Sequence, residues 1–353
     1  MISRLILTAA LFFVSFGLNS AQIQNPDGEL ESLHADDIWA KTLEGRYFNE
    51  FWNYQLYLNN GIKAHIIFNV ANFGRMKSPV SGIRVSINNL NGELYQLQRE
   101  FPIERLVQDK ENYEFRLRQD REIYFRGKLP EEHSIVIQTS KDGDTYDINL
   151  RFYNIQSGFR WADGNYTINN EKVGILTHIP YAEVRGHIAV NNVRRNVSGT
   201  VYMDHTYQDQ MTSKLLHSGY RFISHQSPSD WDLYYFLLAD GAPDLRTIGY
   251  RLQNRNGSVS LQGVNRIQRE RRSDAFGEDI PRELDLRMQN GDVVRFERVT
   301  DEEKFSILRE LGSFSRRVAR RFLGGEVIDF RGEARLNDSG NSKPVEYNLF
   351  MVK

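Results

Sequence analysis

An acid, an imidazole and two phenols follow one another within a single predicted β-strand at residues 197–207. This segment reads Val-Ser-Gly-Thr-Val-Tyr-Met-Asp-His-Thr-Tyr. Side chains alternate between the two faces of a sheet, so Asp204 is expected beside Tyr202 on one face, and His205 beside Tyr207 on the other. Asp204 and His205 can therefore share one pocket only if a bulge or a twist turns one of them round.

An aspartate in the middle of such a strand also needs a specific reason to be there. Aspartate is depleted from strands, whereas the residues around Asp204 are the β-branched and aromatic types that strands favour. The alternative interpretation is that Asp204 ends the strand and that His205 is an ordinary half-buried histidine.

The N-terminus has the order of parts typical of a secretory signal. Arg4 supplies a positive charge, residues 5–18 form an apolar run, and Asn19-Ser20-Ala21 supplies small residues before a polar stretch. We expect residues 1–21 to be a signal peptide that is cleaved near Ala21, which makes the mature protein periplasmic or secreted. An uncleaved anchor is the alternative, although the run is short for a membrane-spanning helix.

The composition excludes several kinds of site. The chain has no cysteine, which excludes disulfides, thiolate catalysis and cysteine-ligated metals. Its formal net charge of -1 provides no overall field for nucleic acid, and acidic neighbours balance the basic run at residues 266–272. The histidine pairs His178/His187 and His217/His225 match no zinc spacing, so no metal is expected.

Short alternating segments separated by turn residues predict an all-β protein. The clearest is a hairpin of residues 52–58 and 64–70 around an Asn-Asn-Gly turn. Such segments stop at a break rich in Gly, Asn and Asp at residues 157–170 and then resume. We therefore expect two tandem lipocalin-like β-barrel or sandwich domains, at residues 22–170 and 171–353.

One helix is predicted in the C-terminal half, at residues 301–323. Acidic residues suit its beginning, apolar residues recur at three- and four-residue steps, and Gly324-Gly325 suits its end. Four cations lie on its other face: Arg316, Arg317, Arg320 and Arg321. A solvated face is the favoured interpretation, and peripheral contact with a membrane surface is the alternative.

The strand at residues 197–207 resembles the Gly-x-x-Trp-x-Asp-His-x-Trp block of the lipocalin-like carotenoid hydratase (hydroxyneurosporene synthase) superfamily. That superfamily includes bacterial proteins of unknown activity and fungal Diels–Alderases. Four further segments resemble its other blocks in the same order, so the resemblance covers most of the mature chain. These segments are residues 50–54, residues 229–241, residues 248–252, and residues 330–336 with 346–347.

The chain departs from the family pattern at several aromatic positions. Tyr202 and Tyr207 stand where the family commonly has tryptophan, Phe51 replaces the first tryptophan of the N-terminal block, and Asn53 stands where its tyrosine is expected. Such changes leave the fold expectation intact. They do affect the expected substrate, because large aromatic side chains shape an apolar pocket.

The resemblance implies two lipocalin-like domains with a site for a hydrophobic small molecule between or within them, and neither a metal nor an organic cofactor. The leading hypothesis is an enzyme that binds a polyene or terpenoid-like molecule and catalyses acid-assisted hydration, isomerisation or cyclisation. Adding water to an unactivated double bond needs a strong proton donor, and a carboxyl group in a dry pocket can stay protonated. Asp204 would be that acid or would orient His205, and Glu346 is a second candidate.

The matching blocks also supply the expected ligand-binding residues, which are Glu50, Trp52, Tyr54, Tyr202, Tyr207 and Trp231. Aromatic faces among them would stabilise a developing positive charge. The rival hypothesis is a non-catalytic carrier for lipid or another apolar ligand. In that case Asp204, His205 and Glu50 are buried structural groups that tie strands and loops together.

Overall fold

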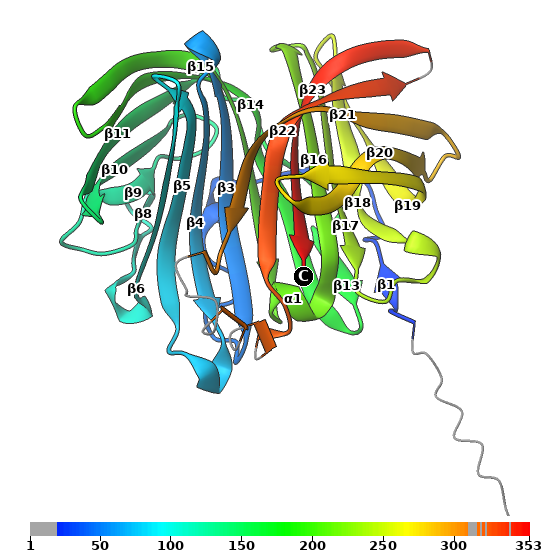
Figure 1. Ribbon diagram of the computed structural model, residues 1–353, viewed down its shortest axis with the longest axis horizontal. Helices are drawn as coiled ribbons and strands as arrows, with labels where there is room; N and C mark the ends of the chain where they lie inside the picture. The colour runs from blue at the N-terminus through cyan, green and yellow to red at the C-terminus, as the bar shows by residue number, and fades with distance from the viewer. Residues whose placement is uncertain (1–19, 310–315, 318–319, 322, 339) are drawn as a thin grey trace, which may run out of the picture.

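The computed structural model describes residues 20–309, 316–317, 320–321, 323–338 and 340–353. It consists of two antiparallel β units that lie side by side, a large curved sheet on the left of Figure 1 and a closed barrel on the right. The predicted all-β class with β units in tandem is therefore confirmed. The predicted signal peptide lies almost entirely outside the described residues.

The first sheet has the strand order β6-β5-β4-β3-β15-β14-β11-β10-β9-β8-β7, and β1, β2, β12 and β13 pair beside this path. Residues from both halves of the order, such as Ile66 and Ile148, belong to one buried cluster, so the sheet curves round to enclose its own core. Its strands are β1 (Ile23–Gln24), β2 (Leu30–Ser32), β3 (Phe48–Leu58), β4 (Lys63–Asn72), β5 (Val80–Leu90), β6 (Glu93–Pro102), β7 (Val107–Asp109), β8 (Glu114–Arg116), β9 (Ile123–Arg126), β10 (His133–Lys141), β11 (Asp144–Tyr153), β12 (Phe159–Trp161), β13 (Asn165–Ile168), β14 (Glu171–Val190) and β15 (Val193–Gln208).

The second unit is a closed barrel in which each strand pairs with the next along the chain and the last pairs with the first. A short helix, α1 (Thr212–Leu215), leads into it. Its interior is filled by a second buried cluster that includes Phe222, Phe236 and Phe330. The strands are β16 (Leu216–Ser227), β17 (Asp230–Ala239), β18 (Thr247–Arg255), β19 (Ser258–Ala275), β20 (Glu278–Met288), β21 (Val293–Ser306), β22 (Val327–Asp338) and β23 (Asn341–Val352). Short 3-10 turns span Ala35–Ile38, Asn59–Gly61, Gly74–Met76, Ile103–Arg105 and Pro243–Leu245.

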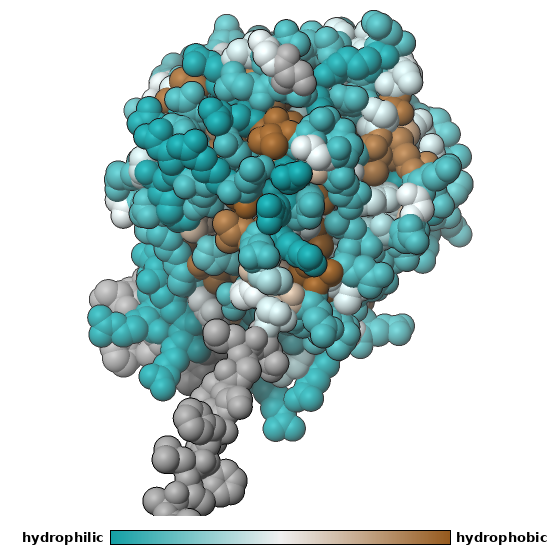
Figure 2. Space-filling view, turned by 90° about the vertical axis from the view of Figure 1, so that its right-hand side faces the viewer, coloured by the Kyte–Doolittle hydropathy of each residue, from teal (hydrophilic) through white to brown (hydrophobic). Residues whose placement is uncertain are grey.

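A third buried cluster joins the two units. It combines Tyr166, Ile175 and Tyr202 from the first sheet with Trp231 and Tyr250 from the barrel. The face of the barrel turned away from this contact is mainly hydrophilic, with only scattered hydrophobic groups (Figure 2). The barrel therefore buries apolar side chains both inside itself and against the first sheet.

The long strands β14 and β15 pair with each other and with β11 and β3, so both belong to the first sheet. By strand pairing, the division between the units therefore falls between Gln208 and Leu216, whereas the predicted boundary at residue 170 precedes β14. A boundary at residue 170 would separate β14 and β15 from β11 and β3, the strands to which their backbones are hydrogen-bonded.

The segment predicted as a helix begins as a strand. Residues 301–306 continue β21, in which Glu303 and Phe305 are buried at the two-residue spacing of a strand. Residues 316–317, 320–321 and 323 are helical, and the rest of the predicted helix lies outside the described residues. Among the residues that are described, no helix has the length and apolar character needed to cross a membrane.

Candidate functional site

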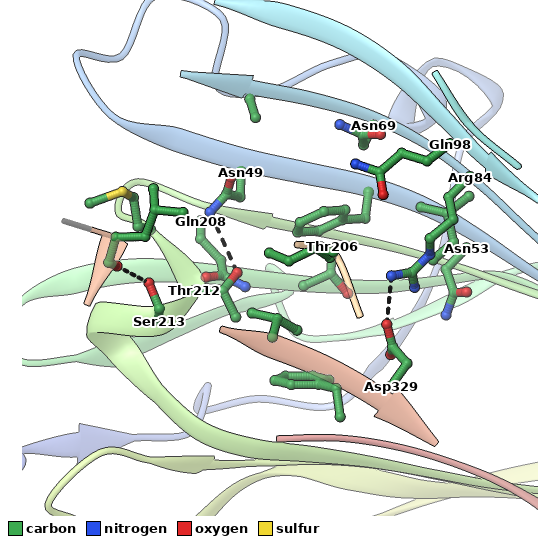
Figure 3. Close-up of a pocket in the computed structure, with 18 of the residues that line it drawn as sticks. Asn49, Asn53, Asn69, Arg84, Gln98, Thr206, Gln208, Thr212, Ser213 and Asp329 are labelled. Atoms are coloured by element: carbon green, nitrogen blue, oxygen red, sulfur yellow. Dashed lines mark hydrogen bonds and ion pairs between the residues drawn. The ribbon is translucent and has the colours of Figure 1, made fainter. Parts of the chain in front are cut away.

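A cavity of about 730 Å³ lies between the first sheet and the barrel (Figure 3). Strand alternation explains its position. Phe51 and Asn53 in β3 line the cavity, whereas their neighbours Trp52 and Tyr54 pack into the core of the first sheet. The cavity thus lies on the outer face of each unit, between two filled cores.

The walls of the cavity combine apolar and polar side chains. Apolar lining residues are Phe51, Ile67, Ala71, Phe73, Met211, Ile307, Leu308, Leu323, Val327 and Phe350. The polar lining residues include six with amide side chains, namely Asn49, Asn53, Asn69, Gln98, Gln208 and Asn348. Charged, hydroxyl and ring groups complete the lining, and they include His65, Arg84, Thr206, Arg221, Tyr235 and Asp329.

Asp204 lies directly behind this wall and is fully buried. Arg221 donates to both of its oxygens, from Nε at 2.7 Å and from Nη2 at 2.9 Å. Asn53 Nδ2 also donates to Asp204 at 2.9 Å, and the Thr206 hydroxyl donates at 3.2 Å. Every one of these hydrogen bonds is donated to Asp204, so its carboxyl group is held by Arg221, Asn53 and Thr206.

Arg221 reaches the cavity from β16 between its two cross-strand neighbours, Tyr235 and Asn348. Its guanidinium lies 3.9 Å from the centre of the Tyr235 ring. Burial lowers the pKa of Arg221, but the charge of Asp204 outweighs this, so the pKa is raised above its usual value. A fixed cation therefore forms part of the cavity wall.

A second ion pair crosses the cavity from one unit to the other. Arg84 Nη1 in β5 lies 2.6 Å from Asp329 Oδ2 in β22, as the dashed line in Figure 3 marks. Nearby, the Thr206 and Tyr235 hydroxyls are 2.8 Å apart. Burial raises the pKa of Tyr235 to about 12, so its hydroxyl keeps its proton at neutral pH.

His205 faces the core of the first sheet, on the side away from the cavity. Its Nε2 lies 2.6 Å from Glu50 Oε1, and its ring stacks on Trp52 at 4.5 Å between centroids. Glu50 also accepts the backbone N–H groups of Lys41 and Thr42 and the Thr42 hydroxyl. The His205–Glu50 pair therefore ties β3 and β15 to the chain at residues 41–42.

The predicted aromatic ligand contacts are all buried. Trp52 Nε1 donates to the Ile38 carbonyl at 2.7 Å, and the Tyr54 hydroxyl lies 2.8 Å from His133 Nε2. The Tyr207 hydroxyl donates to Asn165 at 2.8 Å, and Trp231 Nε1 to Gln156 at 2.8 Å. Tyr202 belongs to the cluster that joins the two units.

Glu346 lies in a different contact between the units. Lys63 Nζ in β4 is 2.9 Å from Glu346, 2.7 Å from Glu302 and 3.1 Å from Glu333. Burial raises the pKa of Glu346 to about 7, although the charge of Lys63 opposes this. The crevice beside it measures only about 20 Å³.

None of the nine predicted site residues is among the described residues that line the large cavity. Asp204 comes closest, since it contacts the lining residues Asn53, Thr206 and Arg221. Four residues that carry polar chemistry in the cavity share a signal in the sequence: His65, Arg84, Arg221 and Asp329. Each is a single charged or imidazole residue between apolar neighbours in a strand, which is typical of a strand covered on both faces.

No cluster of three or more metal-ligating side chains occurs within the described ranges. No family model matches this sequence, and no curated protein matches it either.

Solved structures do match. The protein assigned as AttH from Nitrosomonas europaea superposes with a TM-score of 0.61 over 90% of this chain and 97% of its own, at 12% identity. The chain therefore has the fold of that protein. This confirms the fold that the sequence resemblance implies. Kievitone hydratase from Nectria haematococca gives a TM-score of 0.47 at 12% identity, covering 92% of this chain and 96% of its own. CghA gives 0.47 at 11% identity, covering 95% and 98%.

Proposed function

We propose that this protein is an exported, lipocalin-like enzyme that binds a largely apolar small molecule between its two β units. The reaction class is proton-transfer chemistry without a cofactor, as in hydration, isomerisation or cyclisation. The cavity carries this proposal, because about 730 Å³ lies within the range of roughly 300–1,000 Å³ that small-molecule sites occupy.

The side chains that line the cavity suit such chemistry. Arg221 and the Tyr235 hydroxyl are fixed donors that can stabilise negative charge on a substrate oxygen as it develops. The rings of Phe51, Phe73 and Phe350 supply aromatic faces that can stabilise a developing positive charge, the role expected from the sequence for other aromatic residues. In this proposal Asp204 positions Arg221, and the protonated hydroxyl of Tyr235 is the group in the cavity wall that gives the proton to the substrate.

Filling the cavity is expected to abolish ligand binding while preserving the fold. Ala71 lines the cavity from β4, so Ala71→Trp places an indole in the space that the ligand would occupy. Native mass spectrometry of purified protein should show at least about tenfold less retained ligand, equivalent to about 1.4 kcal/mol of binding free energy. Thermal unfolding should stay close to that of the wild type.

The matched control is Leu94→Trp, which adds the same indole to an exposed position of β6 in the same sheet. It should retain ligand as the wild type does. Equal retention by both variants, or no retained ligand in the wild type, would contradict the proposed cavity site.

A non-catalytic carrier is the second candidate. It is favoured by the hydrogen bonding of Asp204, whose carboxylate accepts four hydrogen bonds from within the protein, as buried structural groups do. Incubating wild-type protein with its co-purified ligand separates the two functions. A ligand whose mass and isomer composition never change identifies a carrier, and chromatography is needed because isomerisation leaves the mass unaltered.

Export is part of the same proposal. In a Gram-negative host the chain is expected in the periplasm with its N-terminus near Gln22, since a charged region, an apolar run and small residues precede that point in order. N-terminal sequencing checks this. Cytoplasmic protein that retains Met1 would contradict it.

Membrane contact through residues 301–323 stays a prediction. Within that segment Arg316 and Arg320 contact Glu326.

A further inference from the structure

A chain of hydrogen bonds connects Arg221 to His65 across the wall of the cavity. Arg221 is a donor only, and it donates to both oxygens of Asp204. Asp204 in turn accepts from Asn53 Nδ2 at 2.9 Å. This fixes the orientation of the Asn53 amide, because its nitrogen must face the carboxylate, so its oxygen faces His65.

The orientation of Asn53 then decides which nitrogen of His65 carries a proton. Asn53 Oδ1 can only accept, so the ring nitrogen that contacts it, His65 Nε2, must donate. Burial, with the positive charges of Arg331, Arg84 and Arg221, lowers the pKa of His65 well below its usual value. A neutral imidazole has a single N–H, which leaves Nδ1 with a free lone pair.

No hydrogen bond to His65 Nδ1 is found among the described residues, and His65 lines the cavity. Two further acceptors lie in the cavity wall. Gln98 Oε1 and Gln208 Oε1 are buried without a partner, and both residues line the cavity at separate places in Figure 3. Buried acceptors without donors are unfavourable, so this surface complements a molecule that brings donors of its own.

We propose that His65 Nδ1 is a fixed hydrogen-bond acceptor that selects ligands carrying a hydroxyl or N–H group on an apolar framework. Asn53 and Asp204 are the positioning residues that set its tautomer. This inference rests on the proposed cavity site and narrows its ligand class, because a pure hydrocarbon such as an unsubstituted polyene leaves Nδ1 and both glutamine oxygens unpaired. The recognition step is a hydrogen bond, with no bond made or broken.

The charged groups around His65 come from several strands. They are Arg84 on β5, Asp204 on β15, Arg221 on β16, and Asp329 and Arg331 on β22. Arg331 is itself paired with Glu303 on β21. Each arginine thus has a carboxylate partner. The neutral imidazole therefore sits within a balanced set of charges, which is suitable for recognising a neutral hydroxyl.

The tautomer is measured without any ligand. In ¹⁵N NMR spectra of histidine-labelled wild-type protein near neutral pH, His65 is expected to show a protonated Nε2 and an unprotonated Nδ1. Loss of that signal in His65→Gln and in His65→Asn assigns it. A proton on Nδ1 would overturn the inference, and so would an imidazolium.

Ligand selection is tested with farnesol and farnesyl methyl ether, which share one apolar chain and differ in that the ether carries a methyl group in place of the hydroxyl hydrogen. Wild-type protein should bind the alcohol about two- to tenfold more tightly, the range of one net hydrogen bond. His65→Gln keeps a donor where Nε2 was but loses the acceptor at Nδ1, so this preference should vanish. His65→Asn places its amide where Nδ1 was, so it should keep part of the preference.

Thermal unfolding of both variants checks that they fold. If His65→Gln does not fold, the wild-type comparison of alcohol with ether still decides the question. Equal wild-type affinities for the two probes would overturn the inference while leaving the cavity site intact. Failure of the wild type to bind either probe would overturn the ligand class. If the cavity were not the binding site, wild type and Ala71→Trp would retain equal amounts of ligand. That outcome is therefore distinct from the outcomes that test His65.

Discussion

Arg221→Met is expected to lower the free energy of unfolding by about 3–5 kcal/mol, because it leaves the buried carboxylate of Asp204 without its cation. Asp204 is fully buried, and without Arg221 the donors left to it among the described residues are the Asn53 amide and the Thr206 hydroxyl. Two hydrogen bonds from neutral groups do not replace a guanidinium that binds both oxygens. Urea denaturation of the variant and the wild type at pH 7 measures the loss. Both curves are fitted with the same dependence of unfolding free energy on urea concentration.

Two further variants show whether an unpaired charge is the cause. Arg271→Met breaks the ion pair with Glu283 on an arginine that is 60% exposed, so it should change stability by no more than about 0.5 kcal/mol. The double variant Asp204→Asn/Arg221→Met removes both charges and should be more stable than Arg221→Met alone. A loss of about 1 kcal/mol or less in Arg221→Met would mean that Asp204 does not depend on Arg221.

Glu346→Gln is expected to gain stability relative to wild-type protein as the pH rises from about 4.5 to about 7. The pKa of Glu346 is raised in the folded protein, so the folded state binds this proton more tightly than the unfolded chain does. The contribution of Glu346 to the stability of the wild type is therefore greatest at low pH, and it falls as the pH rises from about 4.5 to about 7. Glutamine has no proton to lose.

The expected change between pH 4.5 and pH 8 is about 1–3 kcal/mol, from about 1.4 kcal/mol for each unit of pKa shift, discounted because the Glu346 side chain is 25% exposed. Chemical denaturation of both proteins at several pH values measures it. Glu93→Gln is the control, because Glu93 is exposed and is not one of the three glutamates that contact Lys63. Its stability relative to the wild type should show no comparable change with pH. A constant difference between Glu346→Gln and wild type across this range would contradict the burial argument.

Much of the strand architecture follows from local pattern. The predicted hairpin at residues 52–70 is the β3–β4 pair, and its alternation correctly separates core residues from those of the outer face. Asp204 and His205 also face opposite sides of β15, as the alternation of residues 197–207 predicts. Asp204 does not end its strand, since β15 continues to Gln208. The register shifts of the β14–β15 pair lie between 177 and 182 in β14, so no bulge brings Asp204 and His205 to one face.

The sequence pattern predicted the wrong element at residues 301–306, where the periodicities of a helix and of a strand overlap. Residues 301–306 carry acidic and apolar side chains that fit the start of an amphipathic helix, but they also alternate. Pairing with β22 decides in favour of the strand, because it satisfies the backbone and buries Glu303 against Arg331. That partner lies on another strand and has no signature in the local sequence.

The sequence by itself determined which side chains share a face of each strand, because alternation is a property of the extended backbone and needs no distant partner. It also determined that Asp204 requires a specific partner. Only the tertiary structure decided that this partner is Arg221 on the barrel, and that the cavity lies between the units and is lined by His65, Arg84 and Asp329. The physical reason is that these contacts join strands of separate units, whose relative position depends on closing the barrel and packing it against the first sheet.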